Sequence, residues 1–435
     1  MVVLKVRQYY PSSIFLLLTL DSHVSMVANQ KEKLRPMKWI PRFRFSIRTL
    51  MIVTALLAIG LSFVSRRIYK AHLQHQAIAH VLELEGNARY QYEDYSNHTE
   101  EEPTAPKWIR SIFGENYFEK IRSAGVRKGT DLTILANLEE LKSLAFYSGA
   151  YGDLSPLSGL KNLESLTFYS GVDEDLSPLA GLKNLEFLVF GDGELVDISA
   201  LAKLENLEQL YISENKISDL SPLLGLKKLC VIDLTDNKLT DISPLAQVSN
   251  LYRLSLHYNE ELTDISPLAD LKDLHYLHIS YTQVTDISSL AGISTLYKLS
   301  ISGTNVSDIS PLANLTNLVV LELWKTKVTD IRPLEGLKKL EDLELSETSI
   351  SDLTPLANLT NLEFLDLSET KVTDIRPLEG LEKLKYLDLN KTDVSEEDIA
   401  ILKLALPNCS IQSDFTIKPP PSAAPADSDP FGATN

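Results

Sequence analysis

The sequence predicts an α/β solenoid, in which stacked coils each contribute one short strand to a curved parallel sheet. The first observation is a fixed period, because the leucine that opens each unit recurs every 22 residues, with a single step of 23. A period in this range is typical of solenoids. The second observation is that one unit carries regularly placed apolar residues, which a single coil cannot bury without neighbours. The opening leucines are Leu141, Leu163, Leu185, Leu207, Leu229, Leu251, Leu274, Leu296, Leu318, Leu340, Leu362 and Leu384.

The unit Leu362–Leu384 shows how each coil is expected to fold. Residues 365–367 alternate apolar and polar side chains, which indicates a short strand on the concave face of the solenoid. Asp374 is a good helix cap, and Pro377 falls within the first turn, where its missing N–H costs nothing. We therefore expect a short helical or 3₁₀ turn on the convex face.

This pattern resembles the leucine-rich repeat family. In this chain it reads Leu-x-x-Leu-x-Leu-x-x-(Asn/Thr)-x-(Ile/Val)-(Ser/Thr)-Asp-(Ile/Leu)-x-Pro-Leu. The length of 22 residues and the Asp-Ile-x-Pro-Leu half are similar to the internalin and protein-phosphatase-regulatory-subunit type. The resemblance covers about residues 118–412 and twelve units. It implies a scaffold that binds partners, without catalytic residues and without a cofactor.

Two polar columns accompany the leucines. The aspartates from Asp153 to Asp374 are expected to cap the turns. The resemblance implies that the side chain eight residues after each opening leucine bonds backbone groups of adjacent coils. Asn offers several such bonds, Thr fewer and Gly none, so residues 141–206 are expected to be the loosest coils. This column reads Gly149, Gly171, Gly193, Asn215, Asn237, Asn259, Thr282, Thr304, Thr326, Thr348, Thr370 and Thr392.

The head of the chain is basic and the rest is acidic. Residues 1–70 hold twelve Lys and Arg against two acids, whereas the remainder holds thirty against fifty-seven. The head also contains an uncharged apolar run, Thr49–Ser65, flanked by Arg48 and Arg66. Its seventeen residues almost cross a bilayer as a helix. We therefore expect a single-pass transmembrane anchor over residues 48–66.

Basic residues are more numerous before this run than after it. The positive-inside rule then places segment 1–47 in the cytoplasm and the repeats outside it. A signal peptide cleaved after Ser62 and a buried core helix are the alternatives for the same run. Residues 1–36 fit the scheme poorly, and we hypothesise that translation begins at Met37 or Met26. The intact mass of the native protein tests this.

The remaining segments complete the predicted organisation. Residues 67–117 are expected to form a juxtamembrane helix ended by Gly86, a short strand near Tyr90, an acidic loop and an N-terminal cap. The apolar face expected to cover the first coil consists of Trp108, Ile109, Ile112, Phe113, Tyr117 and Phe118. The solenoid is predicted over residues 118–412, closed by a helix that carries Ile399 and Leu402. Residues 413–435 are rich in proline and are expected to be a disordered tail.

Little in the sequence indicates catalysis or metal binding. There is no Gly-rich phosphate loop, Cys-x-x-Cys, His-Glu-x-x-His or Gly-x-Ser-x-Gly. His275 and His278 are expected to point to opposite faces of one strand, so we predict no metal site. Cys230 and Cys409 lie about eight coils apart, too far for a disulfide in this fold. We predict no nucleic-acid partner.

The outward strand positions are the candidate binding residues, because the repeat leaves them free. In the central coils they are aromatic and basic, which are the side chains most often found at binding hot spots. We predict a partner-binding patch formed by Tyr211, Arg253, His257, Tyr258, Tyr276, His278, Tyr281 and Trp324. A secondary acidic strip follows, formed by Glu322, Asp342, Glu344, Asp366 and Asp388. The alternatives are that the aromatic residues merely suit exposed strands and that the acids serve solubility.

These observations favour a membrane-anchored protein that binds a protein or glycan partner on its concave face, outside the cytoplasm. One alternative is a structural or adhesive envelope protein that uses the whole solenoid. Another, by analogy of fold alone, is a regulatory subunit that faces the cytoplasm.

Overall fold

The computed structural model describes residues 46–83, 85–90, 107–114, 117, 119–127, 131–147, 152–170, 172 and 175–415. The chain forms two units, Met1–Ser65 and Arg66–Asn435. The predicted translation start, the basic segment before the apolar run, the acidic loop and the tail beyond residue 415 lie outside the described residues.

Helices, strands and 3₁₀ turns alternate as the repeat predicts. The helices are α1 Ile47–Glu83, α2 Lys107–Phe113 and α3 Glu396–Ala405. The strands are β1 Asn87–Tyr90, β2 Ile121–Val126, β3 Ser143–Phe146, β4 Ser165–Phe168, β5 Phe187–Phe190, β6 Gln209–Ile212, β7 Val231–Asp233, β8 Arg253–Ser255, β9 Tyr276–His278, β10 Lys298–Ser300, β11 Val320–Glu322, β12 Asp342–Glu344, β13 Phe364–Asp366, β14 Tyr386–Asp388 and β15 Ser410–Gln412. The 3₁₀ turns are η4 Thr133–Asn137, η5 Ser155–Gly159, η6 Ser177–Gly181, η7 Ser199–Lys203, η8 Ser221–Leu223, η9 Ser243–Gln247, η10 Ser266–Asp270, η11 Ser288–Gly292, η12 Ser310–Leu312, η13 Arg332–Leu334, η14 Thr354–Leu356 and η15 Arg376–Leu378.

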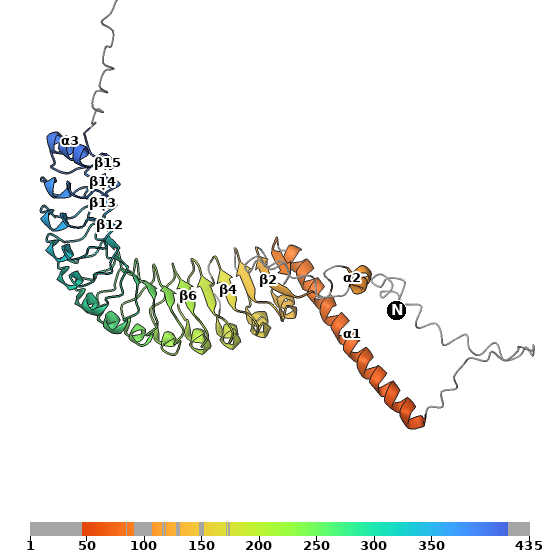
Figure 1. Ribbon diagram of the computed structural model, residues 1–435. Helices are drawn as coiled ribbons and strands as arrows, with labels where there is room; N and C mark the ends of the chain where they lie inside the picture. The colour runs from red at the N-terminus through yellow and green to blue at the C-terminus, as the bar shows by residue number, and fades with distance from the viewer. Residues whose placement is uncertain are drawn as a thin grey trace, which may run out of the picture. The chain divides into compact units, whose positions relative to one another are not determined.

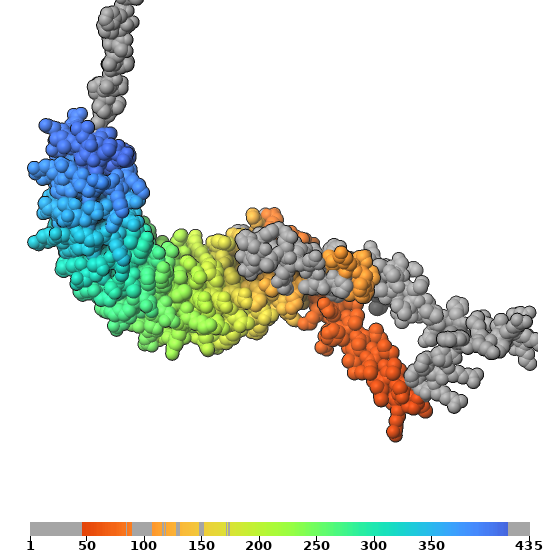
Figure 2. All heavy atoms as spheres, viewed as in Figure 1, coloured from red at the N-terminus to blue at the C-terminus, as the bar shows by residue number. Residues whose placement is uncertain are grey.

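One sheet runs through the whole solenoid. Its strands follow chain order from β1 to β15, and every pair except the antiparallel β1–β2 is parallel. Figure 1 shows the strands along the inner side of a curved stack and the 3₁₀ turns along its outer side, with the path bending between β6 and β12. In the space-filling view the coils pack side by side without a break (Figure 2). The predicted solenoid is confirmed.

The core is a continuous stack of leucines and their equivalents. Every opening leucine from Leu141 to Leu384 is buried, as are the two apolar positions that follow it on each strand. In the first coils the second of these positions holds phenylalanine, and the rings of Phe146 and Phe168 stack with centres 4.8 Å apart. Phe190 continues this ring stack at 5.5 Å from Phe168. Each coil therefore buries its apolar face only against its neighbours.

The aspartate column caps the turns, as predicted. Each aspartate, however, lies one residue before the N-cap position rather than at it. In the last repeat, the Asp374 carboxylate accepts a hydrogen bond from the backbone N–H of Arg376 at 3.0 Å. Arg376 is the first residue of η15, and its N-cap position is occupied by Ile375. The same bond to the residue two positions later recurs along the column, for example from Ser155 to Asp153 at 2.8 Å. The prediction that Asp374 itself is the N-cap residue is wrong by one position.

The residues of the Asn/Thr column lie at the corner of each coil, where the chain turns away from the strand. They stabilise this corner in two different ways. Asn237 receives the N–H of Ile217 from the previous coil at 2.9 Å and donates to the carbonyl of Ile212 at 2.7 Å. By contrast, Thr348 donates only within its own coil, to the carbonyl of Leu345 at 2.6 Å. The expectation that this column joins adjacent coils therefore holds for the asparagines and is wrong for the threonines. Gly149 and Gly171 lie outside the described residues.

The N-terminal end of the solenoid is covered mainly by α1. Its residues Ala77, Ile78 and Val81 belong to the same buried core as the first coils, and β1 pairs with β2 beside them. On α2, however, Trp108 is 65% exposed and Ile112 is 55% exposed. The prediction that this face of residues 108–118 forms the cover is therefore wrong for these two residues. A helix long enough to lie across the end buries more apolar surface than the two short turns of α2.

Two predicted helices, the anchor and its juxtamembrane continuation, are one continuous helix. α1 spans 37 residues, and its most apolar 18-residue window has none of its surface buried. By length and composition it is the one helix in the described part of the chain able to cross a membrane. α1 ends at Glu83, and Glu85 rather than Gly86 adopts the left-handed conformation. Gly86 is needed for another reason, since a Cβ there would collide with the Gly125 carbonyl oxygen.

Candidate functional site

Aromatic side chains gather on the inner side of the bend, at the carboxyl ends of the central strands. We call His257, Tyr258, Tyr281 and Trp324 the aromatic shelf. The Tyr258 and Tyr281 rings stack with centres 4.6 Å apart, and Trp324 meets Tyr281 edge-on at 5.4 Å. His257 contacts both tyrosines, at 4.2 Å and 5.5 Å. Three coils thus contribute rings to one surface, of which Tyr258 remains 41% exposed.

The backbone explains how the shelf tyrosines come together. Tyr258 and Tyr281 both adopt the left-handed conformation, with φ of +58° and +54°. Bulky residues rarely do so, because the Cβ atom crowds the backbone. The equivalent residue of the next coil is Gly303, at φ +65°, and a Cβ added there would lie 2.9 Å from the Tyr281 ring. Glycine at this position therefore leaves room for the ring of Tyr281.

A second ring cluster lies at the amino ends of the same strands. Tyr252 contacts His275 at 4.5 Å and Tyr276 at 5.4 Å, and Tyr276 contacts Tyr297 at 5.7 Å. The Arg253 guanidinium lies 5.9 Å from the centre of the Tyr276 ring, within the range of a cation–π contact. We call this cluster the tyrosine row. The shelf and the row border β8–β10 on two sides.

Small polar residues fill the space between the two ring clusters. Ser280 and Ser300 are buried, and their hydroxyl oxygens lie 2.6 Å apart. Ser302 is 1% exposed, and its hydroxyl has no hydrogen-bond partner. These small hydroxyl groups are buried beneath the centre of the concave face, which the two ring clusters flank.

The two histidines of the patch are neutral near pH 7. Burial lowers the pKa of His278, and the neighbouring Lys298 and Arg253 lower it further, while Glu322 opposes the change. Burial also lowers the pKa of His257, against the effect of Asp233 and Glu322. A neutral imidazole can both donate and accept a hydrogen bond, so these side chains act as polar contacts rather than as cations.

The structure brings together most of the predicted patch, but as two clusters. Tyr211 and His278 belong to neither. The Tyr211 ring contacts Phe187 of β5 at 5.6 Å, and Tyr211 lies two coils before Arg253. His278 is the last residue of β9. Sequence reasoning missed three members of the tyrosine row, Tyr252, His275 and Tyr297. All three follow an opening leucine directly, so the period carries the signal, but the predicted patch includes no residue from that position.

The acidic strip lies on the neighbouring strands of the same face. In the parallel register Glu322 pairs with Glu344, Glu344 with Asp366, and Asp366 with Asp388. Asp342 lies on β12, two residues before Glu344. These carboxylates therefore form a row across four strands.

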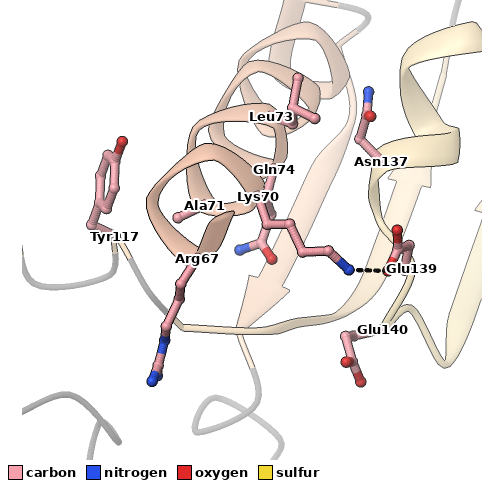
Figure 3. A pocket seen from close by; sticks show the side chains of 9 residues that line it. All are labelled: Arg67, Lys70, Ala71, Leu73, Gln74, Tyr117, Asn137, Glu139 and Glu140. Carbon is pink, nitrogen blue, oxygen red and sulfur yellow. Dashed lines mark hydrogen bonds and ion pairs between the residues drawn. The ribbon is translucent and has the colours of Figure 1, made fainter. Parts of the chain in front are cut away.

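A separate pocket, of about 150 Å³, lies beside α1 at the N-terminal cap (Figure 3). Figure 3 shows the Lys70 ammonium group reaching across the pocket to Glu139, at 2.7 Å. Glu140, which also lines the pocket, pairs with Lys120 at 3.2 Å. Both glutamates that line the pocket are therefore already paired with lysines.

The possible metal ligands and the two cysteines of the described part of the chain indicate neither a metal site nor a reactive thiol. Within the described ranges, no group of three or more His, Cys, Asp and Glu side chains could hold a metal ion. Cys230 and Cys409 are both free cysteines. Burial raises the pKa of Cys409 to about 11, which keeps that thiol protonated and unreactive.

Comparison with known proteins identifies the family. A family model described as leucine-rich repeats in two copies matches residues 183–225, 205–247, 227–270, 249–292, 316–358 and 360–403. An internalin (inlF) from Listeria monocytogenes is 30% identical, with a TM-score of 0.64 over 71% of this chain and 94% of the internalin. The chain belongs to the leucine-rich repeat family, internalin type. Solenoids of this family are typically binding scaffolds rather than enzymes.

More distant leucine-rich repeat proteins share the fold alone. A leucine-rich repeat protein of Leptospira interrogans is 19% identical, with a TM-score of 0.53 over 71% of this chain and 93% of that one. A search of curated protein sequences finds no match.

Proposed function

We propose that this leucine-rich repeat protein is anchored in a membrane by residues 48–66 and binds a protein or glycan partner on its concave face, outside the cytoplasm. The observation that carries the proposal is the pair of ring clusters, the shelf and the row, on the inner side of the bend. Nothing in the stacking of the leucines requires aromatic side chains at these outward positions. Aromatic rings and arginine are the side chains that are enriched at binding surfaces.

Two features support the membrane anchor. Along the first part of α1, large apolar side chains such as Leu50, Leu57 and Phe63 are each more than half exposed. An apolar surface of this size is stable in lipid but not in water. The excess of Lys and Arg before the run favours a cytoplasmic N-terminus.

Topology reporters test the orientation. A phosphatase that is active only outside the cytoplasm, fused after Asn435, is expected to be active, and a fluorescent protein that folds only in the cytoplasm is expected to be dark. The opposite result would indicate a regulatory subunit that faces the cytoplasm. Release of the full-length chain from membranes by a carbonate wash would contradict the anchor.

Capture of the partner tests the concave face. We compare proximity labelling on intact cells by the wild type and by a Tyr276→Ala/His278→Ala/Tyr281→Ala variant. The wild type is expected to label a specific partner that the variant does not label. Tyr147 and Tyr169 offer a matched control, because their rings stack at 5.3 Å on the same face of the first coils. Tyr147→Ala/Tyr169→Ala is expected to capture normally. Equal capture by all three proteins would instead favour an adhesive protein that uses its whole length.

A further inference from the structure

The acidic strip places like charges directly beside one another. Neighbouring strands of a sheet lie about 4.8 Å apart, and Glu322, Glu344, Asp366 and Asp388 are successive partners across β11–β14. Like charges at directly opposed positions destabilise a sheet. The leucine stack does not require these residues, because they occupy outward positions. Asp366 and Asp388 also accept hydrogen bonds from the backbone N–H groups of Ser368 and Asn390, both at 2.9 Å.

The strip is short of positive charge. Lys298 pairs with Glu322 at one end. Among the described residues, no ion pair reaches Asp342, Glu344, Asp366 or Asp388. Asp342 has one buried carboxylate oxygen without a hydrogen-bond partner. Burial, followed by the charges of the neighbouring carboxylates, raises the pKa of Glu344 to about 7.

Aromatic rings lie on both sides of the strip. On β13 and β14 the rings of Phe364 and Tyr386 stack with centres 4.8 Å apart, two residues before Asp366 and Asp388. Trp324 of the aromatic shelf follows Glu322 by two residues on the other side. Rings attract guanidinium and ammonium groups and cover the apolar stems of Lys and Arg side chains. The surface therefore fits a cation attached to an organic body better than it fits a bare ion.

We propose that the acidic strip and its flanking rings bind a basic polypeptide segment, in extended conformation, lying across β11–β14. This inference rests on the proposed function, since it names the class of partner for the concave face. The strip covers three strand spacings, about 14 Å, and an extended chain places side chains of one face about 6.6 Å apart. Two or three Lys or Arg side chains thus match the strip. The absence of a metal-binding group in the described residues favours a polypeptide over a divalent ion.

The test uses the full-length protein in detergent and a fluorescein-labelled peptide that alternates Lys and Thr. The wild type is expected to bind this peptide and not its Glu–Thr counterpart, more weakly as salt increases. Glu344→Gln/Asp366→Asn is expected to weaken binding tenfold or more. Glu335→Gln/Glu382→Gln removes the same charge from exposed positions near the 3₁₀ turns, and it is expected to change binding less than twofold.

Thermal unfolding provides the control for correct folding of the variants. The Glu344→Gln/Asp366→Asn variant is expected to melt at the wild-type temperature or above it, because the change removes repulsion, so weaker binding would not reflect misfolding. Equal peptide affinity for this variant and the wild type would overturn the proposal. So would equally tight binding of spermine or Ca²⁺, which would indicate a general cation site.

The capture experiment separates this inference from the proposed function. If the partner is lost from the Tyr276→Ala/His278→Ala/Tyr281→Ala variant while Glu344→Gln/Asp366→Asn binds the peptide normally, the proposed function stands and this inference fails. If the reporters place the solenoid in the cytoplasm while the peptide still depends on Glu344 and Asp366, the location is wrong and the basic-peptide site stands.

Discussion

The first coils and the later coils share one leucine framework but stabilise their corners differently. In the coils opened by Leu141, Leu163 and Leu185, the strands have four residues and phenylalanine rings stack in the core. From β7 to β14 the strands have three residues. A left-handed residue followed by Asn or Thr turns the chain in each coil from Glu214 onward, with Gly303 in that place once. The comparison shows that burial of leucines makes the stack, while the corner residues decide how firmly each coil is joined to the next.

The largest expected effect comes from breaking an asparagine corner. Asn237 is 1% exposed, and Asn237→Ala leaves the Ile217 N–H and the Ile212 carbonyl buried without partners. Each such group costs about 1–3 kcal/mol, so we expect a loss of roughly 3 kcal/mol in the free energy of unfolding by urea. Thr348→Ala removes one bond within its own coil and is expected to cost about 1 kcal/mol. Equal losses in the two variants would remove the distinction between the corners.

Hydrogen exchange sharpens the same comparison without mutation. Amides in residues 141–206 are expected to exchange about fivefold faster than those of the coils with asparagine corners, because only the asparagine side chains add an inter-coil hydrogen bond, worth roughly 1 kcal/mol. Leu195 is an internal control, since its N–H bonds to the Asn215 side chain at 3.0 Å and should remain protected. Equal protection of the amides from exchange in both regions would contradict the prediction.

The concave faces of the two regions also differ in charge, and pH tests this difference. β3 and β4 present small neutral side chains such as Ser143 and Thr167, whereas β12 presents Asp342 and Glu344. The folded-state pKa of Glu344, about 7, lies above its unfolded value near 4.5. The stability that protonated Glu344 contributes is therefore complete below about pH 4.5 and is lost as pH rises through 7.

The corresponding experiment is thermal unfolding between pH 4.5 and 8. Glu344→Gln is expected to flatten the fall in stability and, at pH 8, to stabilise the protein by about 1 kcal/mol, because two like-charge pairs are removed. Glu382→Gln removes an exposed acid elsewhere and should follow the wild-type profile. A wild-type profile that rises over this pH range would contradict the assignment.

The sequence by itself determined the fold, because a period of 22 forces equivalent residues of successive coils into register. The opening leucines, the capping aspartates and the columns of outward residues follow from that register alone. Contacts outside it required the tertiary structure. One is the edge-on contact between Trp324 and Tyr281, which lie two coils apart and in different columns, while Gly303 in the intervening coil leaves room for the Tyr281 ring.

The cover of the first coil and the reach of the column side chains were also decided only in three dimensions. α1 rather than α2 closes the stack, since the core accepts whichever apolar face lies across its end. Thr348 is too short to reach the previous coil, whereas Asn237 reaches it with both an acceptor and a donor. A repeating sequence fixes which residues are neighbours, but side-chain length and backbone angle decide which of those neighbours touch.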